Sequence, residues 1–138
     1  QLMKEGKYIG YATDLGCCFY DAVAQGLRQL GFTGVTIKSL RQEIYNYVNE
    51  LEEAQKLRGA NNWVKQMKKQ QRSNDVSYEK YKENVQYTSR EAEMRDDFPI
   101  WGEPNIDGRI IAELHNVKIR VYEVVSDYQK FNFLKRDY

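Results

Sequence analysis

The sequence predicts a single α+β domain in which a small β-sheet is flanked by helices. Apolar residues recur at helical spacing in several stretches between residues 19 and 114. Val117, Ile119 and Val121 then alternate with polar residues, as in a strand, and residues 131–133 indicate one more strand. Helices followed by strands are typical of an α+β domain. The 138 residues suffice for one hydrophobic core.

The first predicted helix starts just after two adjacent cysteines, Cys17 and Cys18. Gly31 is placed where glycine commonly ends a helix. The predicted apolar face comprises Phe19, Val23, Leu27 and Leu30.

A cysteine at a helix N-terminus supports two interpretations. The free N–H groups and the positive end of the helix dipole favour a thiolate, and the same N–H groups can hold an oxyanion. This is where a cysteine nucleophile would be placed. Free cysteines are also common as small buried residues, and the local sequence alone favours that second interpretation.

The second helix is predicted to open at Ser39, with Gln42 three residues on in a capping box, and to end near Gly59. Its predicted apolar face comprises Leu40, Ile44, Tyr47, Val48 and Leu51. In the following segment, Trp63, Val64 and Met67 fit part of a helix, with basic residues around them: Lys65, Lys68, Lys69 and Arg72. We expect these cations to form a solvated helix face, with a patch for an acidic partner as the alternative.

Three shorter helices are predicted next. Tyr78, Tyr81 and Val85 support one helix, and Thr88 with Glu91 forms a capping box that opens another. A final helix begins near Pro104, because proline suits the first helical turn. Its predicted buried face comprises Ile106, Ile110, Ile111 and Leu114.

The composition limits which classes of partner and which cellular compartment are expected. The formal net charge of +1 provides no global field for nucleic acid or an acidic membrane, so neither is expected as a partner. No apolar run is long enough to cross a bilayer. Two adjacent cysteines make no disulfide framework, which indicates a reducing, cytoplasmic compartment. For an effector of an intracellular microbe, that compartment would be the host-cell cytosol.

Three blocks carry a family resemblance. They are Gly16 to Ala24, Leu40-Arg41 through Tyr47-Val48, and Trp101-Gly102 with Ala112-Glu113-Leu114 and Asn116 to Tyr122. Together, and in this order, they resemble the ovarian-tumour (OTU) family of cysteine deubiquitinases. The resemblance implies an OTU-like, papain-type cysteine protease fold that hydrolyses isopeptide bonds to ubiquitin or a ubiquitin-like modifier.

The resemblance also assigns the nucleophile. The register of Ala22 and Val23 places Cys18 at the family's catalytic cysteine, whereas aligning Asp14 with the family's first aspartate would choose Cys17 and shift that register. The oxyanion loop is then formed by Leu15, Gly16 and Cys17, with Leu15 standing where the family has aspartate.

The family resemblance further implies the substrate channel and the partners. Trp101-Gly102 is a candidate wall for the thin C-terminal tail of ubiquitin, because a flat ring stands beside a residue without a side chain; a core or lid role for Trp101 is the alternative. We expect no metal and no cofactor, a monomer, and ubiquitin or polyubiquitin chains as partners.

The catalytic histidine is the main departure from the family. His115 is the single histidine, and it follows the helix that begins beside Trp101, which places it roughly 15 Å from the site. We therefore expect residues 1–138 to be one OTU-like domain that is a fragment of a longer protein, and we expect this fragment to lack the family's C-terminal histidine motif. The alternatives are a catalytically inactive OTU-fold module that binds ubiquitin, or an unrelated interaction domain with cysteines in its core.

Overall fold

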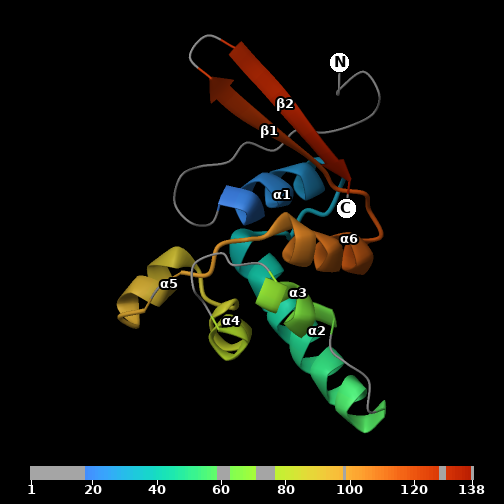
Figure 1. Cartoon of the computed structure of the whole chain (residues 1–138), viewed down its shortest axis with the longest axis vertical. Helices are drawn as coiled ribbons and strands as arrows, with labels where there is room; N and C mark the ends of the chain where they lie inside the picture. The colour runs from blue at the N-terminus through green and yellow to red at the C-terminus, as the bar shows by residue number, and fades with distance from the viewer. Residues whose placement is uncertain (1–17, 59–62, 71–76, 98, 128–129, 138) are drawn as a thin grey trace.

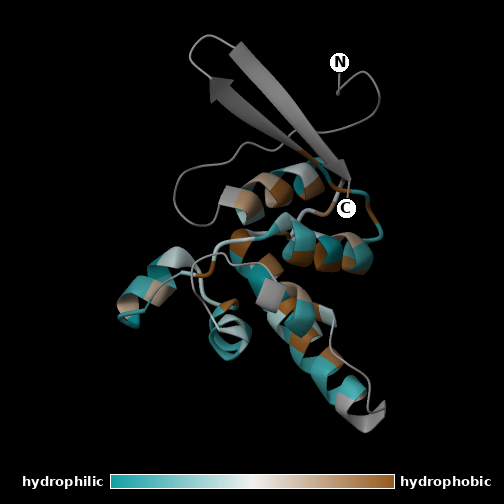
Figure 2. Ribbon diagram, viewed as in Figure 1, coloured by the Kyte–Doolittle hydropathy of each residue, from teal (hydrophilic) through white to brown (hydrophobic). Residues whose placement is uncertain are grey.

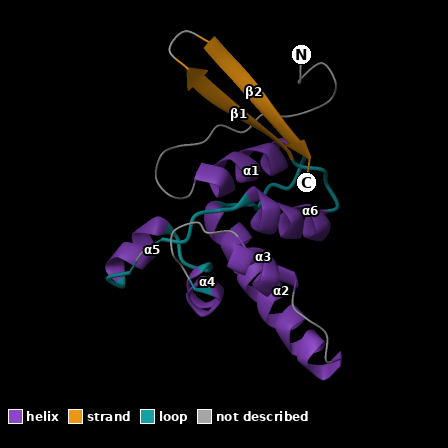
Figure 3. Cartoon of the chain, in the orientation of Figure 1, coloured by secondary structure: helices purple, strands orange, loops and turns teal. Residues whose placement is uncertain are grey.

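The computed structural model describes residues 18–58, 63–70, 77–97, 99–127 and 130–137. Six α-helices, one turn of π-helix and two strands follow one another in this part of the chain (Figures 1 and 3). The order is α1 Cys18–Gln29, α2 Ile37–Arg58, α3 Trp63–Gln70, α4 Tyr78–Asn84, α5 Ser89–Met94, η3 Pro104–Gly108, α6 Arg109–His115, β1 Arg120–Asp127 and β2 Lys130–Asp137. None of the described helices is long and apolar enough to span a membrane.

The core lies where α1, α2 and α6 meet, and the hydropathy colouring shows their apolar stripes (Figure 2). Each helix contributes side chains that are at most 3% exposed: Tyr20, Ala24 and Leu27 from α1, Leu40, Ile44 and Val48 from α2, and Ile110 and Ile111 from α6, next to Ile106 of η3. The predicted apolar periodicity of α2 is therefore confirmed, and burial of these side chains stabilises the packing of the helices.

Two leucines predicted to be buried are exposed instead. Leu30 is 49% exposed because α1 ends at Gln29 and the chain turns at Gly31, which has a φ of 106°. The N–H of Phe32 then bonds back to the carbonyl of Leu27, so the core face of α1 ends at Leu27. Leu114, in the last turn of α6, is 46% exposed at the edge of the helix pair that α6 forms with α2.

The second helix begins two residues earlier than predicted. The N–H of Thr36 donates to the hydroxyl of Ser39 at 2.8 Å, and the N–H of Ser39 donates to the hydroxyl of Thr36 at 3.0 Å. This reciprocal pair caps α2, so the predicted box of Ser39 with Gln42 is wrong. The predicted end at Gly59 lies outside the described residues, although α2 ends at Arg58 beside it.

Both short helices begin at a side-chain cap, and the cap of α5 is the one that the sequence predicted. Ser77 caps α4, and Thr88 with Glu91 forms the predicted capping box of α5, with both hydrogen bonds present. The Nζ of Lys38 lies 2.9 Å from a carboxylate oxygen of Glu91, and the resulting hydrogen bond is the main cause of the lowered pKa of Glu91.

The described strands form one antiparallel pair, with Arg120 opposite Asp137 and Asp127 opposite Lys130. The pair projects from the helical body on the side of α1 (Figure 1). The first strand starts three residues later than the predicted Val117, because Asn116 ends α6 at a φ of 52° and the N–H of Val117 bonds back to Ala112. The second predicted strand, around residues 131–133, lies within β2.

Candidate functional site

The predicted nucleophile is the first residue of a helix. Cys18 opens α1, so its backbone belongs to the first turn, where the N–H groups have no carbonyl partner within the helix. The positive end of the helix dipole favours a thiolate at this position. The predicted oxyanion loop, Leu15, Gly16 and Cys17, lies outside the described residues.

The predicted channel residues meet the chain directly after this cysteine. A Cβ atom placed on Gly102 would lie 2.7 Å from Cδ2 and 2.9 Å from Cβ of Phe19, so the backbone of Gly102 rests against that side chain. A Cβ atom placed on Gly108 would lie 3.2 Å from Cζ, at the other end of the same ring. Only glycine permits such a close approach of the backbone at residue 102. The segment from Gly102 to Gly108 therefore wraps around Phe19, next to Cys18.

Trp101 stands beside this contact and is 45% exposed. An indole half exposed to solvent differs from a core residue, so the core alternative for Trp101 is wrong. Trp101 directly precedes Gly102, whose backbone contacts Phe19 near the start of α1. The role of Trp101-Gly102 as a channel wall stays a prediction.

A buried arginine fastens the strand-like segment before Trp101. Arg41 of α2 is fully buried and donates to the carbonyls of Ile100 at 2.8 Å and Val85 at 3.1 Å. Its guanidinium also lies 4.3 Å from the ring centre of Tyr20, a cation–π contact within α1 and α2. Arg41 thus connects α1, α2 and the segment before Trp101.

The segment after Gly102 is fixed by a buried carboxylate. Asp107 is fully buried, accepts the N–H of Glu103 at 2.7 Å and accepts the hydroxyl of Tyr81 at 2.7 Å. Burial raises the pKa of Asp107 and, together with the nearby Asp107 charge, raises the pKa of Tyr81 well above its ordinary value. These contacts close the turn from Glu103 to Asp107 and connect η3 to α4.

An ion pair is also buried on the same segment. The Nζ of Lys68 in α3 lies 2.8 Å from Oε1 of Glu103, with the two side chains 2% and 11% exposed. The prediction that Lys68 belongs to a solvated face is therefore wrong, whereas Lys65 is exposed as predicted. Sequence reasoning missed Lys68, although its position four residues after the buried Val64 places it on the same helical face.

His115 lies at the opposite end of the helices from Cys18. Its Nε2 is 2.7 Å from Oε2 of Glu43, and its ring packs edge-on against Phe32 at 5.1 Å between centres. Phe32 follows the C-terminal end of α1, whereas Cys18 is at the beginning of this 12-residue helix, which is about 18 Å long. The expectation that His115 stands away from the site agrees with this placement.

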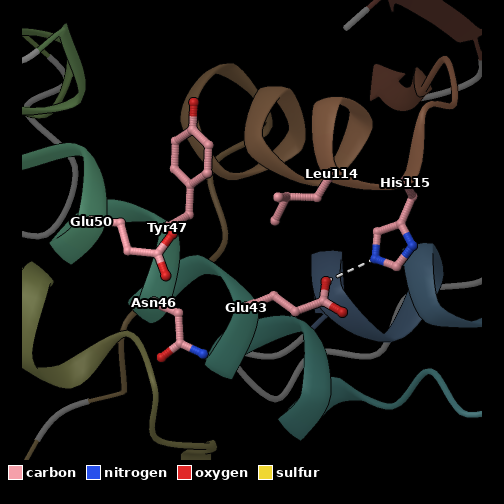
Figure 4. A pocket seen from close by; sticks show the side chains of 6 residues that line it. All are labelled: Glu43, Asn46, Tyr47, Glu50, Leu114 and His115. Carbon is pink, nitrogen blue, oxygen red and sulfur yellow. Dashed lines mark hydrogen bonds and ion pairs between the residues drawn. The ribbon is translucent and has the colours of Figure 1, made fainter. Parts of the chain in front are cut away.

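The surroundings of His115 form an open hollow of about 280 Å³ between α2 and α6 (Figure 4). Its lining comprises Glu43, Asn46, Tyr47, Glu50, Leu114 and His115. In the part of the chain that the structure describes, no group of three or more His, Cys, Asp or Glu side chains is arranged so that it could hold a metal ion.

The described part of the chain is thus mostly helical, with one antiparallel strand pair and with a cysteine at the start of a helix that packs against a glycine-containing segment. No family model matches the sequence, and a search of curated proteins finds no match. Solved structures do share the fold. An OTU deubiquitinase from Wolbachia pipientis wMel bound to ubiquitin aligns with a TM-score of 0.66 at 23% identity, over 96% of this chain and 74% of that one.

A second structure of an OTU deubiquitinase from Wolbachia pipientis wMel aligns with a TM-score of 0.56 at 27% identity, over 83% of this chain and 59% of that chain. The chain therefore has the OTU fold, and the resemblance predicted from its sequence blocks is confirmed at this level.

Proposed function

We propose that this chain is a cysteine-type deubiquitinase of the OTU class with Cys18 as its nucleophile. The observation that carries the proposal is the contact of Gly102 with Phe19, which places Trp101 and Gly102 beside the N-terminus of α1. A helix N-terminus that favours a thiolate and a segment suited to bind an extended peptide are then adjacent. The fold shared with OTU deubiquitinases supports the same activity.

The chemistry follows from these groups. The Cys18 thiolate attacks the carbonyl carbon of the glycine at the end of ubiquitin, and the resulting oxyanion accepts hydrogen bonds from backbone N–H groups of the loop formed by Leu15, Gly16 and Cys17. The C–N bond then breaks, and the lysine amine leaves with a proton from the general acid. Water attacks the thioester, gives up a proton to the base, and releases the ubiquitin carboxylate and the free thiol.

The proposed substrate is ubiquitin or a ubiquitin-like modifier with a thin C-terminal tail. Since Trp101 presents a half-exposed ring and the adjacent Gly102 contacts Phe19 near the start of α1, an extended tail can lie over the Trp101 ring on its way to Cys18. One of the structures with the same fold contains ubiquitin, which supports ubiquitin as the partner. The papain-type arrangement, a monomeric state and a reducing cytoplasmic compartment belong to the same proposal.

The proposed reaction requires a base other than His115. The His115 ring is engaged by Glu43 and Phe32, beyond the C-terminal end of α1. A cysteine thiol with an ordinary pKa and no base is only a few per cent thiolate near neutral pH, so turnover depends strongly on that base. Labelling by a reactive probe depends less on the base than turnover does, because the helix N-terminus alone favours the thiolate.

A ubiquitin probe with a C-terminal electrophile tests the proposal. We expect the probe to label the wild-type chain and the Cys17→Ala variant, and to fail with Cys18→Ala. Labelling that survives Cys18→Ala but disappears in Cys17→Ala would refute the assignment of the nucleophile. Absence of labelling combined with ubiquitin binding in a titration would instead favour the inactive ubiquitin-binding module.

A further inference from the structure

The helix α3 contributes one buried cation to the segment that carries the candidate channel. Lys68 is 4% exposed and pairs with Glu103, the residue directly after Gly102. We propose that Lys68 is a positioning residue, whose ion pair with Glu103 sets the place of Trp101-Gly102 relative to the start of α1. The inference rests on the proposed function, since it assigns Lys68 a part in binding the modifier's C-terminal tail.

The contacts form a short path from α3 to the candidate nucleophile. Lys68 Nζ lies 2.8 Å from Oε1 of Glu103, and the adjacent Gly102 rests against Phe19, the neighbour of Cys18. The backbone of Glu103 is held from the other side, because its N–H donates to Asp107 at 2.7 Å. Glu103 is thus fixed through both its side chain and its main chain, which leaves Gly102 little freedom to move away from Phe19.

The position of the Lys68 ammonium is also restricted by an aromatic ring. It lies 4.9 Å from the ring centre of Tyr81, whose hydroxyl donates to Asp107. Tyr81 therefore contacts both charged groups that bind Glu103, and α3, α4 and η3 meet at this residue. The Lys68 ammonium is attracted both to the Glu103 carboxylate and to the face of the Tyr81 ring, so its position between them is restricted. The ion pair of Lys68 with Glu103 therefore also sets the distance between α3 and Glu103.

Burial of this pair favours a role in positioning over one in stability. Bringing two charges out of water costs about as much as their attraction returns, and apolar replacements of both partners are often as stable. Apolar replacements of both partners, however, lose the directed contact between the ammonium and the carboxylate. By contrast, Lys80 of α4 pairs with Asp97 at 2.6 Å while 49% exposed, where an ion pair contributes little to position or stability.

Displacement of the segment would weaken productive binding of an extended tail. A shift of about 1 Å in a residue that positions substrate can lower a rate by as much as a hundredfold. The effect should appear in the probe concentration needed for half-maximal labelling, because Lys68 acts on the wall and not on the cysteine itself. The intrinsic reactivity of the thiol should be unchanged.

The test uses three changes at the pair and one matched control. The single variant Lys68→Met leaves Glu103 without its cation, the double variant Lys68→Met with Glu103→Leu removes both charges, and Lys68→Arg keeps the cation. Lys80→Met removes an exposed cation of the same length. Each protein is tested for cooperative unfolding, for hydrogen exchange in peptides covering residues 99–108, for alkylation of Cys18 by iodoacetamide, and for labelling by the ubiquitin probe.

We expect the double variant to unfold cooperatively and to be alkylated at the wild-type rate, while its half-maximal probe concentration rises about tenfold or more. Exchange in residues 99–108 should accelerate in the same variant. Lys68→Arg should restore most of both properties, and Lys80→Met should match the wild type. Probe labelling and exchange equal to those of the wild type in a folded double variant would overturn the proposal. Loss of folding in both Lys68→Met and the double variant would overturn it as well.

The exchange measurement separates this inference from the proposed function. If the wild-type chain is not labelled by the probe, the proposed function fails, and exchange in residues 99–108 still decides whether Lys68 positions the segment. If the wild type is labelled and the Lys68 variants match it in labelling and in exchange, the proposed function stands and the positioning role is wrong.

Discussion

Replacing Gly102 with alanine tests the contact that brings the candidate channel to the nucleophile. The new methyl group would lie 2.7 Å from Cδ2, 2.9 Å from Cβ and 3.1 Å from Cγ of Phe19. These distances are well below van der Waals contact, and Cβ of Phe19 is attached directly to the backbone of α1. Relief therefore requires the segment and the first turn of α1 to move apart.

The cost of this substitution follows from the overlap. Extra methyl groups in a packed site typically cost about 1–3 kcal/mol in the free energy of unfolding. For a domain of this size the melting temperature falls by about 4 °C per kcal/mol, so we expect a decrease of roughly 4–12 °C. The same displacement moves Trp101 away from Cys18, so labelling by the ubiquitin probe should slow by about tenfold or more.

Gly26 provides the matched control. It lies inside α1, and a Cβ atom placed there meets nothing within 4 Å. Gly26→Ala should therefore stabilise the chain by about 0.5–1 kcal/mol, through the higher helix propensity of alanine, and leave labelling unchanged.

Urea unfolding followed by circular dichroism, together with probe labelling at several probe concentrations, measures both effects. Phe19→Leu in the Gly102→Ala background should recover part of the lost stability, since a smaller side chain removes the overlap with the ring. If Gly102→Ala equals the wild type in stability and labelling, the proposed contact between the channel segment and α1 is wrong.

Three further predictions concern the surrounding residues. Arg41→Lys should lower the free energy of unfolding by about 2–4 kcal/mol in urea titrations, because one ammonium cannot serve the carbonyls of both Val85 and Ile100; wild-type stability would contradict this role. His115→Ala should cost about 1 kcal/mol and leave probe labelling within about twofold, and loss of labelling in a folded variant would restore His115 as a candidate base. Burial and the hydrogen bond to Glu113 raise the pKa of Tyr47 from 10.0 to about 12, so the stabilisation from its protonated form is complete below pH 10 and is lost as the pH rises toward 12. Stability measured across that range should therefore fall less steeply in Tyr47→Phe, and identical slopes would refute the assignment.

The local elements were largely determined by the sequence. The periodicity of α2 identified Leu40, Ile44 and Val48 as core residues, and spacing alone identified the capping box of Thr88 with Glu91. Both depend on neighbours within one or two helical turns, so the chain's own periodicity contains the information. The sequence blocks likewise indicated the OTU fold and placed Cys18 at the start of a helix.

The site depended on contacts between distant segments. Nothing in the local pattern shows that Gly102 rests against Phe19, or that Lys68, surrounded by other cations, is buried against Glu103. Periodicity tells which face of a helix is apolar, but it does not tell which loop that face meets or which charge finds a partner there. The sequence by itself determined the helices and the candidate nucleophile, whereas only tertiary packing decided what stands beside that nucleophile, because partners far apart in the chain are chosen by mutual fit of shape and charge.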